Sequence, residues 1–387
     1  MPDDTPPLAL TLHRRLSDIP AMEWDACAGA DNPFVSHAFL AALEDSGSAV
    51  ESRGWLPQHA ALRDASGRLL GCAPVYAKSH SQGEYVFDHG WADALERAGG
   101  RYYPKLQVAV PFSPVPGPRL LMHPDLGVPH EALALGLVQA CGQLGCSSVH
   151  VTFCTEAEWT ALGEAGWLQR LGTQFHWSNP GYSTFDDFLS ALSSRKRKAI
   201  RRERREARSA GLTLRMLRGA EITERHWAAF HRFYRATTDR KWGRSAYLTP
   251  RFWPMLGERL GDRVVLMVAE RSGEPVAGAL NLIGRDALYG RNWGAVVDVP
   301  FLHFELCYYM AMDLAIALGL PRVEAGAQGE HKIQRGYLPV PTFSAHWIEH
   351  PGLRRAVGDV LARERPAMLR EMEALATLSP FRRDEAG

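Results

Sequence analysis

Apolar and polar residues alternate along two stretches of the chain, and each stretch turns at a Ser-Gly pair. The first reads HAALRDASGRLLGCAPVYA from His59, and the second reads VVLMVAERSGEPVAGALNLI from Val264. Strand-forming residues on both sides of a turn dipeptide are typical of a β-hairpin. The pattern therefore predicts one hairpin in each half of the chain.

A helical pattern followed by a short strand also occurs once in each half. Residues 131–144 and 304–318 carry apolar side chains at helical spacing, and a glycine follows each run. Glycine after the last helical residue is the usual C-cap signal. Residues 148–153 and 322–325, which come next, read as short strands. Both halves therefore share one order of elements.

A weaker repeat marks the end of each half. A Gly-aromatic-Leu triplet precedes a His-Trp pair by ten residues, with the triplets at Gly166 and Gly336 and the pairs at His176 and His346. Chance similarity is the alternative, but the shared spacing and element order favour duplication. We therefore expect two copies of one α/β domain, the first degenerate and the second holding the active site, and then a C-terminal helix. The expected ranges are 1–178, 179–350 and 351–387.

The charge balance of the chain hides a local extreme. Its 387 residues hold 44 Lys and Arg against 43 Asp and Glu, a net charge of +1, and 46% of them are hydrophobic. This composition is typical of a globular protein and excludes a uniformly basic nucleic-acid binder and a disordered chain. Residues 195–208 nevertheless read RKRKAIRRERREAR and carry a local charge of +7. A mildly acidic body is thus combined with one basic helix.

Several common chemistries leave sequence signatures that this chain lacks. It has no HExxH, GxSxG, Walker or CxxC motif, which excludes the commonest zinc hydrolases, α/β-hydrolases and P-loop enzymes, and we expect no metal site. Its six cysteines read as buried, reduced thiols. The N-terminus has no signal-peptide pattern and no apolar stretch is long enough to span a bilayer, so we expect a cytoplasmic protein without stable membrane insertion.

One loop of the second half is unusually rich in polar groups. The segment AGAQGEHKIQRGYL follows the strand at 322–325, whereas the matching segment of the first half, EAEWTALGEAGWL, is apolar and helical in character. Loops at strand ends carry functional groups on a rigid scaffold, and glycines let the backbone approach a ligand. A solvated surface loop is the alternative. The candidate site residues are Gln328, Glu330, His331, Lys332, Gln334 and Arg335.

Three further segments mix aromatic and polar residues. ALYGRNWGAV lies at the end of a strand, and an edge strand with a turn is the alternative there. EYVFDHGWAD and RYYPKLQVAVPFSPVPGPRLL belong to the first half, where the prolines exclude a regular helix and favour an extended wall beside a cleft. The candidate substrate-binding residues are Arg291, Asn292 and Trp293 in the second half and Asp88, Tyr103 and Lys105 in the first.

The basic run at 195–208 is predicted to form a helix with one narrow apolar stripe. Its cations repel one another unless an anion is near, so their density favours a polyanionic partner. RNA, a coenzyme A diphosphate, a nucleotide-sugar diphosphate and lipid headgroups all fit this requirement. A solvated helix face, relieved by Glu203 and Glu206, is the alternative. The residues expected to bind donor phosphates are Arg195, Lys196, Arg197, Lys198 and Arg201.

Three segments resemble the FemABX aminoacyl transferases. LSSRKRKAIRRERREARSAGLTL, from Leu192, looks like the basic helix that opens the second domain of that family, and ALYGRNWGA and IQRGYLPVPTFSAHW follow in the matching order. The resemblance covers nearly the whole chain and is closest to the FemAB-like branch of predicted N-acyltransferases or peptidoglycan biosynthesis proteins. It implies the GNAT acyltransferase superfamily and two tandem GNAT-like α/β (α+β) domains with mixed, largely antiparallel sheets.

The chain departs from the family pattern at two points. A lysine follows the first aromatic residue of the family's motif, but the aligned pair here is Ile333-Gln334, with Lys332 and Arg335 on either side. The pyrophosphate-binding loop of GNAT proteins is one residue short in the segment 291–295. The resemblance therefore implies acyl transfer to an amine and leaves open whether acyl-CoA or aminoacyl-tRNA is the donor.

An N-acyltransferase is the function that these observations favour. The resemblance implies transfer of an acyl or aminoacyl group, with acyl-CoA or aminoacyl-tRNA as co-substrate and no permanently bound cofactor, to a small-molecule or peptide amine in peptidoglycan or cell-envelope metabolism. Glu330 or His331 would take the amine proton, and Lys332 or the backbone N–H groups near Gly329 would stabilise the oxyanion. The alternative is a non-catalytic protein that binds RNA, such as tRNA, or phosphate on a GNAT scaffold.

Overall fold

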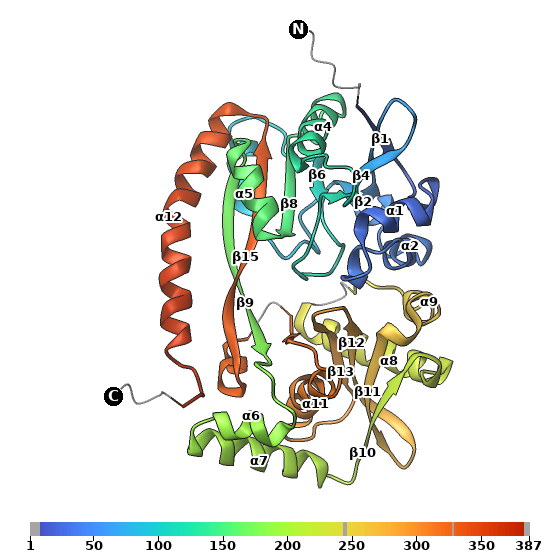
Figure 1. The fold of residues 1–387 in the computed structure, drawn as a ribbon, viewed down its shortest axis with the longest axis vertical. Coiled ribbons are helices and arrows are strands. Elements are labelled where there is room, and N and C mark those ends of the chain that lie inside the picture. Colours follow the sequence, from blue (N-terminus) through green and yellow to red (C-terminus); the bar gives the residue numbers. More distant parts are fainter. Residues whose placement is uncertain (1–7, 243–245, 327–328, 383–387) are drawn as a thin grey trace. The chain divides into compact units, whose positions relative to one another are not determined.

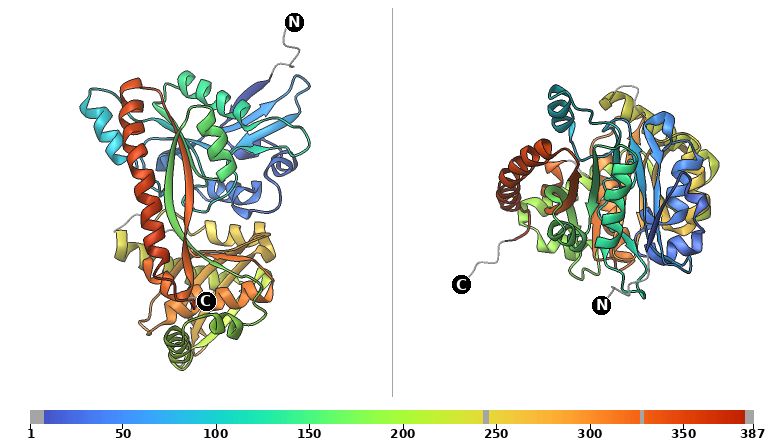
Figure 2. Two further views of the ribbon diagram at one scale, coloured as in Figure 1. Left: turned by 60° about the vertical axis from the view of Figure 1, so that its left-hand side comes forward. Right: turned by 90° about the horizontal axis from the view of Figure 1, so that it is seen from above.

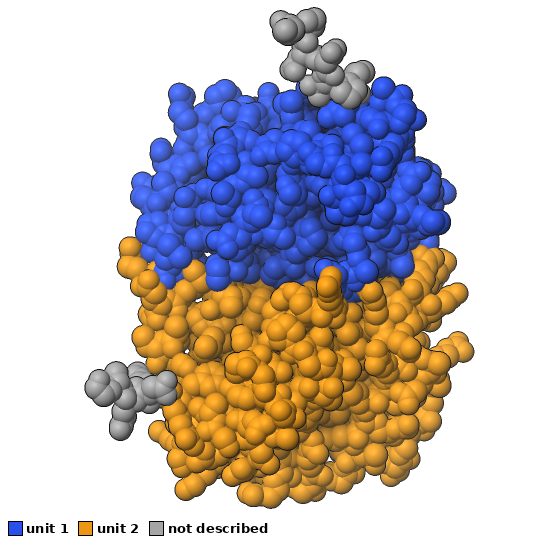
Figure 3. Space-filling view, in the orientation of Figure 1, with its two compact units in different colours: residues 1–172, 341–369 blue, residues 173–340, 370–387 orange. Residues whose placement is uncertain are grey.

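The computed structural model describes residues 8–242, 246–326 and 329–382. The chain forms two compact units, coloured separately in Figure 3. Unit 1 comprises Met1–Gly172 and Pro341–Leu369, and unit 2 comprises Thr173–Val340 and Arg370–Gly387. Each unit combines helices with β-strands (Figure 1), which confirms the α/β class predicted from the sequence. Within the described residues, no helix has both the length and the apolar character needed to cross a membrane.

Unit 1 contains two sheets. Their strand orders are β15-β8-β6-β5-β2 and β1-β3-β4-β7. The hairpin predicted from His59 is the antiparallel pair β3–β4. The strands are β1 (Ala9–His13), β2 (Trp55–Pro57), β3 (His59–Arg63), β4 (Leu69–Ala73), β5 (Val75–Lys78), β6 (Lys105–Val108), β7 (Leu121–Met122), β8 (Ser148–Cys154) and β15 (Tyr337–Ile348), which enters unit 1 at Pro341.

Apolar helix faces pack on the sheets of unit 1. Leu133 and Leu137 of α4 join one buried core with residues of β6 and β8, and α4 ends before Gly145, whose φ of +63° suits the predicted glycine C-cap. The C-terminal helix α12 packs Val357 and Leu361 near Leu168, and Figure 2 shows the course of the helix in two further views. The helices are α1 (Ala21–Ala28), α2 (His37–Asp45), α3 (His89–Arg97), α4 (His130–Gln143), α5 (Glu156–Glu164) and α12 (Pro351–Ala376), of which residues up to Leu369 belong here.

Unit 2 contains strands in the order β10-β11-β12-β13-β14-β9. The hairpin predicted from Val264 is β11–β12, and β13–β14 is the parallel pair among its described pairs, the others being antiparallel. This pattern confirms a mixed, largely antiparallel sheet. The strands are β10 (Thr213–Arg218), β11 (Val264–Arg271), β12 (Glu274–Ile283), β13 (Leu288–Ala295), β14 (Arg322–Glu324) and β9 (Leu168–Ser178), which enters unit 2 at Thr173.

Helices cover both faces of the sheet in unit 2. Helix α8 passes so close to β13 that a Cβ at Gly294 would lie 2.1 Å from the backbone oxygen of Phe233, so glycine is required there. On the opposite face, α10 and α11 are joined by the π-helical turn Glu305–Tyr309, and Leu306 packs in one core with Ala279. The helices are α6 (Phe185–Ala191), α7 (Ser194–Arg208), α8 (Glu224–Trp242), α9 (Phe252–Leu260), α10 (Leu302–Phe304) and α11 (Met310–Ala317).

The two units share one strand–helix–strand connection. Helix α4 links the parallel strands β6 and β8 in unit 1, and the α10–α11 helix links the parallel strands β13 and β14 in unit 2. The two His-Trp pairs also occupy matching registers, because His346 faces His150 of β8 and His176 faces Glu324 of β14. The repeat in the sequence therefore corresponds to one topology that occurs twice.

Each unit is completed by a strand from the other half of the chain. Residues 176–178 of β9, which ends the first half, pair with β14 of unit 2. Residues 343–348 of β15, which ends the second half, pair with β8 of unit 1. The compact units thus differ from the expected contiguous ranges 1–178, 179–350 and 351–387, because the last strand of each half is exchanged and α12 divides at Leu369.

Candidate active site

In unit 2, the strands β13 and β14 separate soon after they pair. Strand β14 ends at Glu324, opposite Tyr289, whereas β13 continues to Ala295. Gly290 and Ala325 are the first residues beyond the last pair. The separated strands form a fork, which we call the strand fork.

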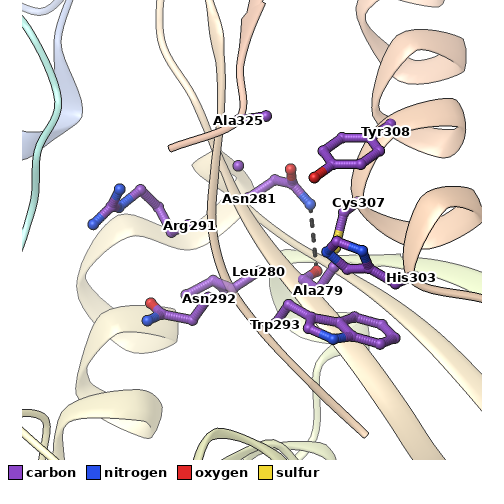
Figure 4. A pocket seen from close by; sticks show the side chains of 11 residues that line it. Ala279, Leu280, Asn281, Arg291, Asn292, Trp293, His303, Cys307, Tyr308 and Ala325 are labelled. Atoms are coloured by element: carbon purple, nitrogen blue, oxygen red, sulfur yellow. Dashed lines mark hydrogen bonds between the residues drawn. The ribbon is translucent and has the colours of Figure 1, made fainter. Parts of the chain in front are cut away.

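A cavity that is partly open to solvent lies at the strand fork (Figure 4). Its lining comes from β12, β13, the α10–α11 helix and the residue after β14. Three of the residues predicted to bind substrate, Arg291, Asn292 and Trp293, belong to this lining. The segment ALYGRNWGAV thus forms one wall of this cavity.

A β-bulge shapes this wall. In the pairing of β12 with β13, Ala279 faces Trp293 and Asn281 faces Gly290. Leu280, the one residue between them on β12, therefore stands opposite two residues of β13. A bulge breaks the regular ladder and re-aims side chains next to functional sites. The two residues in the bulge are Arg291 and Asn292.

The opposite wall comes from the π-helical turn and the residues before it. His303, Cys307 and Tyr308 face the cavity, with the His303 ring 5.2 Å from the Trp293 ring and 5.3 Å from the Tyr308 ring between centroids. Single π-turns inside helices are frequent at functional sites. Burial raises the pKa of Tyr308, so this side chain presents a neutral hydroxyl to the cavity.

Part of the polar loop reaches the strand fork as a short 3₁₀ helix, Glu330–Arg335. The buried Lys332 donates hydrogen bonds from Nζ to the backbone oxygens of Ala325, at 2.7 Å, and Gly326, at 2.8 Å. Burial raises the pKa of the Cys307 thiol, and the Lys332 charge opposes that rise. The Lys332 ammonium therefore acts electrostatically on the cavity wall.

His331 contacts the cavity through Tyr308. Its Nε2 lies 2.9 Å from the Tyr308 hydroxyl oxygen, which joins an exposed imidazole to a cavity-lining hydroxyl. The neighbouring Glu330 is exposed, and Gln328 lies outside the described residues. Of the candidate bases, His331 is the one with a described path to the cavity.

Arg335 lies beside the site in a buried ion pair. Its Nη2 donates to Glu203 at 2.9 Å, its Nη1 donates to the backbone oxygen of His331 at 2.9 Å, and its guanidinium stacks 3.3 Å from the Phe304 ring centroid. These contacts hold the 3₁₀ helix against α7 and α10. A substrate contact by Arg335 remains a prediction.

The basic helix α7 has an inner and an outer face. On the inner face, Arg204 and Arg208 pair with the fully buried Glu305, at 3.1 and 2.7 Å. On the outer face, the exposed cations stand three or four residues apart, which places them on one side of the helix. We call this set the outer basic stripe, and it consists of Arg195, Lys198, Arg202 and Arg205.

The five predicted phosphate-binding residues of α7 differ in their contacts. Lys196 donates to Gln334, and Arg201 pairs with Asp186 at 3.0 Å. Within the described part of the chain, the other three form no ion pair or side-chain hydrogen bond, and they are Arg195, Arg197 and Lys198. Two of the five cations are therefore used in contacts within the protein, and the other three are available to bind an anion.

The first-half candidates form a buried network in unit 1. Lys105, which is fully buried, pairs with Asp88 and with Glu84, the latter at 2.7 Å, and Tyr103 bonds Ser81 at 2.8 Å. Burial raises the pKa of Glu84 to about 7. Burial also acts to raise the pKa of Asp88, but Lys105 and His150 outweigh it and hold that pKa below its usual range. A substrate contact at these candidates remains a prediction.

In unit 1, protein fills the position that corresponds to the strand fork. His150 of β8 and Glu324 of β14 each face the histidine of a His-Trp pair, so these two residues occupy equivalent positions in the two units. Two residues further along, Thr152 is then equivalent to Gly326. Arg119 donates from Nε to the backbone oxygen of Thr152 at 2.9 Å, and Gly117 donates to that of Phe153 at 3.0 Å. The proline-rich segment that contains Gly117 and Arg119 thus pairs with the end of β8.

The sequence pattern missed several residues of the cavity. Asn281, Cys307, Tyr308 and the buried Glu324 beside the strand fork were not among the candidates. A lone Asn within the apolar strand AGALNLI was an available signal, because buried polar groups require partners. No comparable signal marked Tyr308, which reads as an ordinary apolar-face aromatic.

Comparison with known proteins gives a family match and a fold match. The chain matches the model of the FemAB-like family, described as peptidoglycan biosynthesis/recognition, over residues 15–383. No curated protein sequence matches it. The solved structure of FemX is similar with a TM-score of 0.55 and 10% identity, covering 88% of this chain and 98% of that one.

Two other solved structures show the same breadth of coverage. A conserved protein of unknown function from Bacteroides thetaiotaomicron has a TM-score of 0.52 and 12% identity, over 87% of this chain and 99% of the other. A tandem GNAT protein from the clavulanic acid biosynthesis pathway has a TM-score of 0.47 and 11% identity, over 89% and 99%. At such low identities, the likenesses to FemX and to the Bacteroides thetaiotaomicron protein show the fold alone.

Proposed function

The chain belongs to the FemAB-like family and is a transferase, and from this premise and its cavity we propose that it is an N-acyltransferase. It moves an acyl or aminoacyl group from acyl-CoA or an aminoacyl-tRNA to an amine of a peptidoglycan or other cell-envelope precursor. Both donors are cytoplasmic, and a cytoplasmic site of action is part of the proposal. The acceptor is a small molecule or a peptide.

The strand fork is the observation that carries this proposal. Beyond Tyr289, β13 no longer pairs with β14, and an extended, amide-containing segment of the donor or the acceptor can add to a strand edge of this kind. Acyl transfer also needs hydrogen-bond donors or a positive charge aimed at the oxyanion of the tetrahedral intermediate. The bulge at 291–292 and the ammonium of Lys332 supply such groups next to the cavity.

The reaction transfers one acyl group and moves one proton from the amine. The amine lone pair forms a C–N bond with the acyl carbon, and the C–S or C–O bond to the donor breaks. The proton released by nitrogen passes to His331 through the Tyr308 hydroxyl, and the departing thiolate or alkoxide takes up a proton. This route uses the 2.9 Å contact between Tyr308 and His331 and needs no covalent enzyme intermediate.

The unpaired cations of α7 are proposed to hold the donor phosphates. Arg195, Arg197 and Lys198 have no partner within the described residues, and both candidate donors carry phosphate groups. The alternative function is a non-catalytic RNA- or phosphate-binding protein that uses the same three cations. It predicts salt-dependent RNA binding without turnover of any acyl donor.

A transfer assay with matched variants tests the proposal. Purified protein is supplied with charged total tRNA or with acyl-CoA and a panel of amine acceptors. We expect Tyr308→Phe and His331→Gln to lower kcat by about 100-fold, because each removes one step of the proton path. Tyr308→Phe keeps the ring that packs 5.3 Å from the Tyr337 ring, so its unfolding temperature should match that of the wild type.

Two outcomes would contradict this assignment. If Glu330→Gln carries the loss and His331→Gln does not, Glu330 is the base. If the wild type binds tRNA but transfers no acyl group to any amine in the panel, the non-catalytic alternative stands.

A further inference from the structure

Asn281 is a buried polar side chain with an unused acceptor. It lies on β12, lines the cavity at the strand fork and is 1% exposed. Its Nδ2 donates to the backbone oxygen of Ala279 at 3.3 Å, whereas its Oδ1 has no hydrogen-bond partner within the described residues. A buried acceptor without a partner costs the full desolvation of that group.

The contact with Ala279 fixes which way the amide points. A backbone carbonyl only accepts hydrogen bonds, so the atom that faces Ala279 has to be the Nδ2 donor. The Oδ1 atom is therefore directed away from Ala279 and toward the strand fork (Figure 4). The atom of this side chain that has no hydrogen-bond partner among the described residues is therefore the acceptor Oδ1.

Gly290 leaves space in front of this oxygen. A Cβ built at Gly290 would lie 3.4 Å from Oδ1 of Asn281, 3.4 Å from the backbone oxygen of Glu324 and 3.7 Å from Cα of Ala325. These are ordinary contact distances, so an alanine fits without displacing its neighbours. Glycine instead keeps a recess at the strand fork, next to the unpaired oxygen.

The charges around the recess favour a neutral N–H donor over an ammonium group. No Asp or Glu is among the described residues that line the cavity, and Arg291 is. The nearby carboxylate of Glu324 pairs through Oε1 with Arg322 at 2.9 Å, and burial raises its pKa to about 7, so that it is partly neutral. Lys332 adds a positive charge at the end of β14. An amine bound here is therefore disfavoured in its protonated form.

We infer that Asn281 binds the attacking amine of the acceptor, accepting a hydrogen bond on Oδ1 from one N–H of the neutral amine in the recess left by Gly290. This inference rests on the proposed function and adds a residue for acceptor binding. One N–H is held by Asn281, and the lone pair remains directed at the acyl carbon. The aromatic walls formed by Trp293, His303 and Tyr308 enclose the carbon chain of the amine.

Direct binding of a minimal amine tests this inference without any acyl donor. Glycinamide is titrated into the full-length protein at pH 6 and pH 9 and observed by ligand NMR, because an α-amine titrates between these values. We expect the wild type to bind it about tenfold more tightly at pH 9. The titratable or charged groups facing the recess from the surrounding elements are Arg291, His303, Cys307, Tyr308, Glu324 and Lys332.

Three variants separate recognition from a structural role. Asn281→Leu removes the acceptor and should weaken binding at pH 9 about tenfold, with an unfolding temperature that is unchanged or higher because a buried unpaired oxygen is lost. Gly290→Ala fills the recess and should weaken binding equally with Asn281 intact. Asn281→Asp provides a carboxylate, which favours the ammonium form and should reverse the pH preference.

Each other outcome overturns the inference. It fails if the wild type does not bind glycinamide, if it prefers pH 6, or if Asn281→Leu and Gly290→Ala bind as the wild type does. A protein that shows the expected binding pattern but no acyl transfer contradicts the proposed function alone. A protein that transfers acyl groups equally well with Asn281→Leu contradicts this inference alone.

Discussion

Single residues of the site differ in whether their charge is used inside the protein or offered to a ligand. Arg335 illustrates the first case, since the residue is only 8% exposed and its guanidinium pairs with Glu203. A buried ion pair adds little net stability, but removing one partner leaves an uncompensated charge. Arg335 is therefore expected to matter first for the position of the 3₁₀ helix that carries His331 and Lys332.

A double-mutant cycle at this ion pair tests that role. Arg335→Met should lower the free energy of unfolding by about 2 kcal/mol, because the half-buried Glu203 carboxylate loses its cation and keeps only the Tyr309 hydroxyl as a partner. Adding Glu203→Gln should recover part of that loss, with a coupling of at least about 1 kcal/mol. Chemical denaturation measures both values. If Arg335→Met raises KM while the unfolding free energy is unchanged, Arg335 is a substrate contact instead.

The residue pattern predicted the site only in part. The polar loop and the segment at 291–293 were identified from composition, since dense polar groups beside glycines are visible in one dimension. Asn281 and Tyr308 were not, because their importance depends on what faces them across the cavity. That Oδ1 of Asn281 has no hydrogen-bond partner within the described residues becomes visible only in the folded structure.

At the scale of elements, α7 combines two functions that its sequence does not separate. Its periodicity predicted a helix, which the structure confirms as Ser194–Arg208. The acids that neutralise its inner face, Glu305 and Asp313, are about one hundred residues further along the chain. The partition into inner and outer cations is thus a tertiary property.

Two charge-neutralised variants separate these functions. Neutralising the outer basic stripe to glutamine should leave stability within about 0.5 kcal/mol and weaken tRNA binding, with a reduced salt slope. Neutralising Arg204 and Arg208 should instead lower the free energy of unfolding by about 3 kcal/mol, because Glu305 is fully buried. Thermal unfolding and tRNA titrations at several salt concentrations report the two effects. Equal loss of tRNA binding in both variants would contradict the partition.

The whole molecule is organised by the exchange of one strand between the two halves. Unit 1 takes residues 343–348 to pair with β8, and unit 2 takes residues 176–178 to pair with β14. Each half of the chain therefore lacks a strand that its own sheet requires. The two halves are expected to depend on each other for folding.

Expression of the halves tests this dependence. A fragment of residues 1–178 lacks the partner strand of β8 and the apolar face of α12, so it should show no cooperative thermal unfolding. Co-expression with residues 179–387 should restore a cooperative transition by supplying both missing segments. Circular dichroism during heating measures this. A cooperative transition in the isolated fragment would show that the exchanged strand is dispensable.

Short-range patterns in the amino-acid sequence specify the local features of this protein. The two hairpins, the glycine caps at Gly145 and Gly319, the basic helix and the duplicated element order all follow from periodicity and turn chemistry, which act over a few residues. The tertiary structure alone decided the strand fork, the direction of Asn281, the internal partners of α7 and the strand exchange. These depend on contacts between distant segments, whose free energies are set by burial and pairing in three dimensions.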